Sequence, residues 1–261
     1  MPAVSDEQVA RSLGLYAGMV GRVMADPERW LADDGPDDGD GGDGHGGAPA
    51  GLPRRAVDAV SHRAFGSVTP ASEQWPTVPV ADRVSWWVSR IGAVAGLAAA
   101  APRFAGALAD RVPLQAALGA AASGLAVCAV AHEQGITTPS QWVPLLAKVL
   151  FDRDLPHDPA VVPDTATSEQ ELAAEPADAP DGDAGGGGSS VLRGAKTLWR
   201  LARTFRGVDE LLDHRPRGGF LARAVAKVPV VGVAGGWLDE RGAIRKAAEE
   251  TGRLIAGGAA R

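Results

Sequence analysis

The sequence predicts an all-α protein, an Ala- and Gly-rich helical bundle with two disordered linkers. The chain of 261 residues is rich in Ala, Val and Leu but holds only five Phe and one Tyr, a mixture that favours close-packed helices over sheets. Apolar residues recur at helical spacing along most of the chain. Two acidic, Gly-rich stretches interrupt this pattern, and neither holds enough apolar surface to offset the entropy cost of ordering.

These features divide the chain into five parts. We expect an N-terminal amphipathic helix in residues 1–32, a disordered Asp/Gly linker in 33–51, the helical core in 52–158, a disordered acidic and Gly/Ser-rich linker in 159–190, and basic helices that complete the bundle in 191–261. The Asp/Gly tract superficially resembles a calcium loop. It lacks the terminal Glu that an EF-hand requires, so we interpret it as a linker.

The first predicted helix begins at a capping box, formed by Ser5 and Gln8, and ends at Asp26–Pro27. Its apolar stripe comprises Val9, Leu13, Tyr16, Val20 and Val23. A second, short helix is predicted over residues 53–66, with a proline in its first turn.

Two apolar helices are predicted at the centre of the chain. The helix over residues 80–104 has one bulky apolar face and one face of small residues, including Gly92 and Gly96, which lets another helix approach closely. The helix over 112–136 is apolar on nearly every face until Gly135 ends it, which indicates burial in protein or in lipid.

The length and charge of these two helices favour a buried or interfacial hairpin over a membrane span. A spanning helix needs roughly 20 predominantly apolar residues. Arg90 interrupts the first helix, and the second consists largely of weakly hydrophobic Ala and Gly. The N-terminus carries acidic residues where a signal peptide would be basic and apolar. We therefore expect the protein in the cytoplasm, where it could also lie at the inner face of the cell membrane.

A further core helix is predicted over residues 139–155. The least favoured interpretation of the chain is an enzyme whose site lies near Cys128, His132 and Asp152. Cys128 and His132 lie four residues apart, which would place a thiol beside a base. A buried thiol among Ala and Val is usually inert, however, and a helix C-terminus explains the histidine. The loop after this helix gathers metal-ligand types without a defined spacing, so we expect no metal site and no cofactor. Its candidates are Asp152, Asp154, His157 and Asp158.

Positive charge gathers in the C-terminal part of the chain. Residues 1–190 hold 12 Lys or Arg against 25 Asp or Glu, a net charge of −13, whereas residues 191–261 hold 14 against 7, a net charge of +7. The helix predicted over 190–214 is basic and amphipathic, a pattern typical of binding at a membrane surface. The alternative is a surface helix whose apolar face packs on the core. The residues that would contact a membrane or another anionic partner are Lys196, Trp199, Arg200 and Arg203. No motif indicates nucleic-acid binding.

Residues 228–254 place a β-branched run and several glycines before a helix-forming stretch. The glycine spacing does not match the G-x-G-x-x-G of a dinucleotide loop, and a P-loop needs Lys and Ser or Thr after its last glycine. We interpret Gly232 and Gly236 as glycines for close helix packing. Pro229 would begin the turn of a hairpin, and Asp239 would begin the last helix.

Three segments together resemble the EcsC-like family of bacterial proteins. They are "PLQAALGAAASGLAVCAVAHEQGI", "VPLLAKVLFDRD" and "KVPVVGVAGGWLDERGAIRKAA". The matching positions are Ala131, Gly135, Pro229, Gly232 and Gly236, and the resemblance covers about residues 80–155 and 190–256. It implies a membrane-proximal accessory role, linked to transporter operons and secretion, and supplies no catalytic residues.

The sequence therefore favours a non-enzymatic helical protein that associates peripherally with the membrane or with a membrane complex. The alternative from another class is a soluble helical scaffold that binds a protein partner.

Overall fold

The computed structural model describes residues 4–31, 68–104, 112–174, 190–205 and 232–259. Within these ranges the chain forms helices and no β-strand, which confirms the predicted all-α fold class. The helices are α1 (Asp6–Ala25), α2 (Pro27–Leu31), α4 (Val80–Phe104), α5 (Val112–Glu133), α6 (Pro139–Phe151), α7 (Thr165–Ala173), α8 (Ser190–Arg203) and α11 (Gly232–Ala259). Two short 3₁₀ helices, η1 (Trp75–Thr77) and η2 (Pro159–Val161), lie in the connections.

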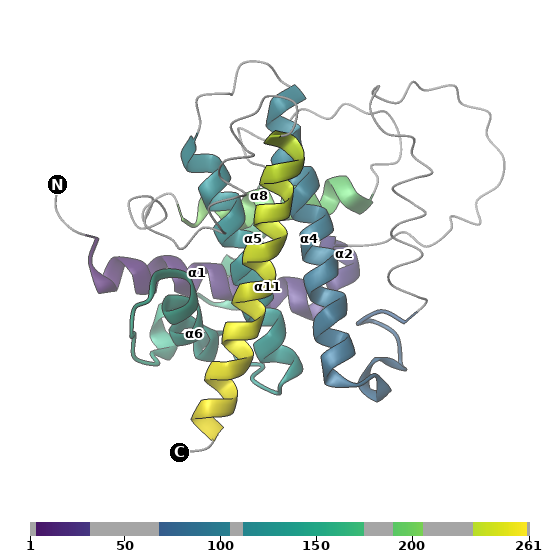
Figure 1. Ribbon diagram of the computed structural model, residues 1–261. Helices are drawn as coiled ribbons and strands as arrows, with labels where there is room; N and C mark the ends of the chain where they lie inside the picture. Colours follow the sequence, from purple (N-terminus) through teal and green to yellow (C-terminus); the bar gives the residue numbers. More distant parts are fainter. Residues whose placement is uncertain (1–3, 32–67, 105–111, 175–189, 206–231, 260–261) are drawn as a thin grey trace.

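The long helices α4, α5 and α11 pack against one another and form the centre of the molecule. Figure 1 shows these three helices running side by side, with α1 crossing them. The start of α4 lies beside the end of α5, because Trp87 donates a hydrogen bond to Glu133, and the two helices are therefore antiparallel. Helix α8 packs on α4 and α5, whereas α6 and α7 pack on α1.

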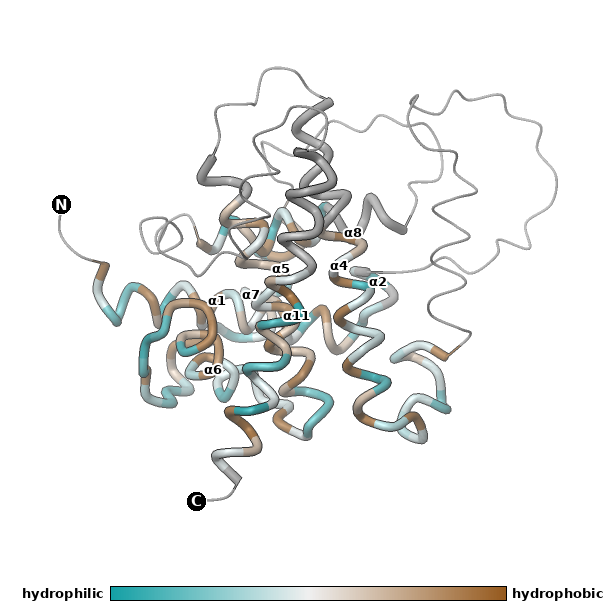
Figure 2. The backbone as a smooth tube through the Cα atoms, in the orientation of Figure 1, coloured by the Kyte–Doolittle hydropathy of each residue, from teal (hydrophilic) through white to brown (hydrophobic). Residues whose placement is uncertain are grey.

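Helix α5 is buried on almost every side, as its composition predicted. The window Ala116–Glu133 is long and apolar enough to cross a membrane, but 89% of it is buried inside the protein. Other helices surround this segment, so burial in protein accounts for its apolar character. Hydrophilic and hydrophobic residues instead alternate along α1 and along the C-terminal half of α11, as Figure 2 shows.

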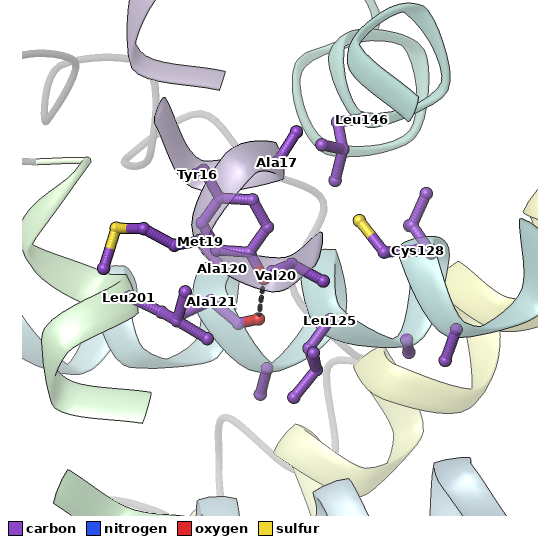
Figure 3. Close-up of a cluster of buried hydrophobic side chains, with 14 of the residues drawn as sticks. Tyr16, Ala17, Met19, Val20, Ala120, Ala121, Leu125, Cys128, Leu146 and Leu201 are labelled. Atoms are coloured by element: carbon purple, nitrogen blue, oxygen red, sulfur yellow. Dashed lines mark hydrogen bonds between the residues drawn. The ribbon is translucent and has the colours of Figure 1, made fainter. Parts of the chain in front are cut away.

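The N-terminal helix reaches the core through Tyr16, the only tyrosine of the chain. Its hydroxyl donates a buried hydrogen bond of 2.6 Å to the backbone carbonyl of Ala121 on α5 (Figure 3). Gly124 leaves room for the ring, since a Cβ at this position would lie 2.9 Å from the tyrosine hydroxyl. This hydrogen bond adds a polar contact between α1 and α5 to the buried apolar residues of α1.

The predicted ends of α1 and the predicted glycine turn after α5 are confirmed. The Ser5 side chain accepts a hydrogen bond from the Gln8 backbone N–H at 3.2 Å, and α1 ends before Asp26. Gly135 has a φ of 89°, and its N–H bonds to the carbonyl of His132 at the end of α5. A left-handed conformation of this kind favours glycine, which explains why the helix ends there.

The prediction that residues 159–190 form a disordered linker is wrong for its first half. Residues 159–161 form η2 and residues 165–173 form α7. The Asp164 side chain caps α7, and the helix buries Leu172 completely. Average composition suggested a linker, but a buried leucine, a side-chain cap and the ion pair between Arg22 of α1 and Glu169 accompany the packing of this helix on α1.

Three helix boundaries also differ from the prediction. Helix α11 is continuous from Gly232, so Asp239 lies inside the helix and does not begin it. Helix α6 ends at Phe151 because Asp152 adopts a left-handed conformation with a φ of 52°. Helix α8 ends at Arg203, where the Thr204 N–H bonds back to the carbonyl of Leu201.

Some predicted features fall outside the residues that the structure describes. They are the linker at 33–51, the short helix at 53–66, the turn at Pro229, and the stretches 175–189 and 206–214.

Candidate functional site

The apolar face of α8 packs against the core. Leu198, Leu201 and Phe205 are fully buried, and the Phe205 ring packs on Tyr16 with 5.1 Å between centroids. Trp199 is only 3% exposed. The expectation that Trp199 contacts a membrane from the surface is therefore wrong, because its indole lies in the interior. The sequence pattern placed it at the edge of the apolar stripe and could not show on which side of that edge it lies.

The basic side of α8 remains at the surface. Lys196, Arg200 and Arg203 are partly exposed. For the residues of α8 whose side chains the structure describes, the alternative that the apolar face packs on the core is thus confirmed, and it is the charged side chains that can meet an anionic partner. Such a contact would be electrostatic and would not insert apolar residues into lipid.

Helix α2 covers one flank of α8. The Thr197 hydroxyl donates a hydrogen bond of 2.9 Å to the backbone carbonyl of Trp30, and the Trp30 side chain is 6% exposed. The Arg29 guanidinium lies 4.6 Å above the Trp30 ring and also pairs with Glu169 on α7 at 2.8 Å. The basic helix is therefore joined to α2 and, through Arg29, to α7.

A buried carboxylate at the other end of the bundle was not predicted. Glu133, whose side chain is 3% exposed, accepts hydrogen bonds from the indole N–H groups of Trp75 at 3.2 Å and Trp87 at 2.8 Å. Its second oxygen pairs with Arg83 at 3.0 Å. The signal in the sequence was a lone acidic residue at the end of an apolar helix, but only the fold brings the three donors to it.

Three tryptophans pack around this carboxylate. Trp86 contacts Trp75 edge to face at 5.4 Å and Trp87 at 5.0 Å between ring centroids. The arrangement fastens η1 and the start of α4 to the end of α5. Since both oxygens of Glu133 are engaged, we interpret the cluster as a structural clamp and not as an acid or base for catalysis.

The residues of the enzyme alternative do not form a site. Cys128 is fully buried in the apolar cluster that also holds Leu125 and Leu146 (Figure 3). Burial raises the pKa of the Cys128 thiol well above its usual value, so the thiol stays protonated and unreactive. Asp152 lies at the surface with its side chain 87% exposed. His132, the third candidate, packs its ring edge to face on Trp142.

The loop after α6 uses its polar residues for local structure. Asp152 and Asp154 both pair with Lys148, at 2.9 and 3.3 Å. The hydrogen bond to Asp152, and after it the one to Asp154, raises the pKa of the lysine. Asp158 caps η2, and His157 shares a hydrogen bond of 3.0 Å with the Ser140 hydroxyl. Among the described residues, no three His, Cys, Asp or Glu side chains are grouped for a metal ion.

Glycines mediate close packing, and the spacing of Gly14 and Gly18, which matches that of Gly92 and Gly96, correctly indicates one such contact. A Cβ at Gly14 would collide with the backbone carbonyl of Val161 in η2, and one at Gly194 of α8 would lie 3.0 Å from Val94 of α4. Gly92 is buried in α4. The surroundings of the other three predicted packing glycines lie outside the described contacts. These three are Gly96, Gly232 and Gly236.

No protein-family model, curated protein or solved structure matches this chain. We therefore infer its function from the residues and contacts described above.

Proposed function

We propose that the protein is a non-enzymatic helical protein that attaches peripherally to an anionic membrane surface, or to a complex at that surface. The observation that carries the proposal is the construction of α8. Its apolar face holds the helix on the core, and its basic side stays partly exposed through Lys196, Arg200 and Arg203. The helix thus presents positive charge on a fixed support.

The charge distribution of the chain supports this proposal. The net charge of +7 in residues 191–261 contrasts with −13 in residues 1–190, so positive charge is concentrated in the part of the chain that contains α8. Each Lys or Arg near such a surface contributes about 1 kcal/mol of binding free energy. The resemblance to EcsC-like proteins, which implies a membrane-proximal role, agrees with this assignment.

Vesicle flotation with a charge-neutralised variant tests the proposal. We expect the wild-type protein to float with vesicles that contain phosphatidylserine and not with pure phosphatidylcholine vesicles. Replacing Lys196, Arg200 and Arg203 together with Gln should weaken binding by on the order of 100-fold, because three attractive charges are lost.

The matched control removes the same charge from another part of the surface. Arg11, Lys148 and Arg153 lie in the acidic part of the chain and form exposed or partly exposed ion pairs. Their triple replacement with Gln should leave vesicle binding unchanged or slightly stronger, since it makes that region more acidic. Equal loss of binding in both triple variants would contradict the role of α8.

A soluble helical scaffold that binds a protein partner is the second candidate. The burial of Ala116–Glu133 and of the apolar face of α8 favours it, because the described residues expose little apolar surface to lipid. Cell fractionation separates the two: a scaffold would stay wholly in the soluble fraction, whereas a peripheral membrane protein would be released from membranes by salt.

A further inference from the structure

Helix α2 is a short element placed against the helix to which we assign the membrane contact. It has five residues, Pro27–Leu31, and packs on α8. The backbone carbonyl of Trp30 accepts a hydrogen bond from Thr197. Thr197 lies in α8 between Lys196 and Arg200. A tryptophan, which prefers the membrane interface in other proteins, is therefore held next to a basic helix.

Besides the buried hydrogen bond to Thr197, the described polar contacts that hold α2 lie at the surface. Arg29 pairs with Glu169 of α7 at 2.8 Å, where the two side chains are 52% and 37% exposed, and Arg22 of α1 approaches the same carboxylate at 3.6 Å. The Arg29 backbone N–H also donates to the Asp26 carboxylate at 3.0 Å. Exposed ion pairs contribute little in water, and a helix of five residues has almost no stability of its own.

Helices α2 and α8 differ in how many buried side chains hold them in place. Helix α8 is anchored by Leu198 and Leu201, and by Phe205 two positions after its last residue, all of which are fully buried. Helix α2 has one buried side chain among those described, Trp30. Local opening begins where buried contacts are fewest, so α2 should detach while α8 stays in place.

We propose that α2 is a displaceable cover whose release brings Trp30 and the Thr197 flank of α8 to the headgroup and acyl boundary of an anionic membrane. This proposal rests on the proposed function and adds an apolar contact to it. Attraction by Lys196 and Arg200 would come first, and the interfacial preference of tryptophan would then favour the open position of α2.

The release step is tested in solution, without lipid. Glu169→Gln removes the carboxylate that holds Arg29 and Arg22, and we expect trypsin to cleave after Arg29 about two- to five-fold faster. Cleavage after Arg11, which is exposed on α1, should not change. Asp154→Asn is the matched control because it weakens an exposed ion pair with Lys148 far from α2 in the sequence.

The outcomes of this proteolysis experiment are distinct. Faster cleavage after Arg29 in Glu169→Gln alone supports the displaceable cover. An unchanged rate, or an equal acceleration in Asp154→Asn, would overturn it.

The membrane step is tested by fluorescence quenching with brominated lipid in phosphatidylserine vesicles. Glu169→Gln should bind more tightly than wild type and show more quenching of tryptophan emission, and adding Trp30→Phe should reduce the extra quenching. Binding of both proteins without extra quenching would overturn the cover and leave the proposed function standing. If neither protein binds at low salt, the proposed function itself fails, even where the proteolysis result shows that α2 is released.

Discussion

At the scale of single residues, the buried carboxylate of Glu133 makes the sharpest contribution to the fold. Two indole donors and one guanidinium converge on it from Trp75, Arg83 and Trp87, all of which lie at least 46 positions before Glu133 in the sequence. Removing one partner of a buried charge pair leaves the other without compensation, so such a cluster is costly to disturb.

Glu133→Gln should lower the free energy of unfolding by about 2–4 kcal/mol, because the neutral amide offers Arg83 no charge and can accept fewer hydrogen bonds. Trp75→Phe, which removes one donor and keeps an aromatic ring, should cost about 1 kcal/mol from the lost hydrogen bond. Urea unfolding followed by circular dichroism measures both changes. Wild-type stability in the Gln variant would show that the clamp does not hold the bundle end.

The cap of α7 gives a pH-dependent prediction at the same scale. The backbone N–H of Thr167 donates to the Asp164 carboxylate at 2.7 Å, and this hydrogen bond lowers the pKa of Asp164. A lowered folded-state pKa means that the stabilisation is present above the unfolded pKa, about 3.9, and disappears as the pH falls through the folded value.

Asp164→Ala should therefore destabilise the protein at pH 7, and the difference from wild type should shrink as the pH falls below the unfolded pKa of about 3.9. Hydrogen exchange of the α7 amides, compared between the two proteins across this range, measures the effect where it arises. A difference that does not depend on pH would contradict the role of the charged cap.

At the scale of elements, helix contacts decide whether a glycine can be replaced. Gly14 lies where α1 meets the backbone of η2, whereas a Cβ at Gly242 of α11 would have no neighbour within 4 Å. Both are helical, so helix propensity alone predicts that alanine would stabilise both by about 1 kcal/mol.

Gly14→Ala should instead destabilise the protein by about 1–3 kcal/mol, because the new methyl group forces α1 and η2 apart. Gly242→Ala should stabilise it by about 0.5–1 kcal/mol. Chemical denaturation of the two variants under identical conditions gives the two signs directly. Stabilisation by both substitutions would mean that α1 and η2 are not in contact.

The elements that sequence reasoning predicted correctly are those with local signals. The capping box at Ser5, the left-handed glycine at Gly135 and the all-round apolar character of α5 depend on neighbours within a few positions. Helix α7 was missed because its acidic, Ala-rich composition outweighed the single buried Leu172.

Features that depend on tertiary contacts could not be predicted from the sequence. The clamp at Glu133 needs donors more than 40 positions away, and the burial of Trp199 depends on how α8 is rotated on α4 and α5. The cover over α8 likewise joins Trp30 to Thr197 across 167 positions. Periodicity shows which face of a helix is apolar, but it does not show which helix that face will meet.

At the scale of the whole molecule, the fold separates the apolar interior from the charges that we assign to binding. Helix α5 has the length and composition of a membrane span, yet α4, α6, α8 and α11 enclose it. Because apolar surface is already buried within the protein, we expect the bundle to reach the membrane as a folded unit, held by charge and reinforced where α2 is released.

The most direct test of this account is flotation of the wild-type protein with phosphatidylserine vesicles over a range of salt concentrations. Attraction between surface charges is screened at short distance in high salt, with a Debye length of about 3 Å at 1 M compared with about 10 Å at 0.1 M. We predict binding at low salt and release of most of the protein as salt approaches 1 M. Absence of binding at low salt, or full retention at 1 M salt, would contradict attachment through the basic side of α8.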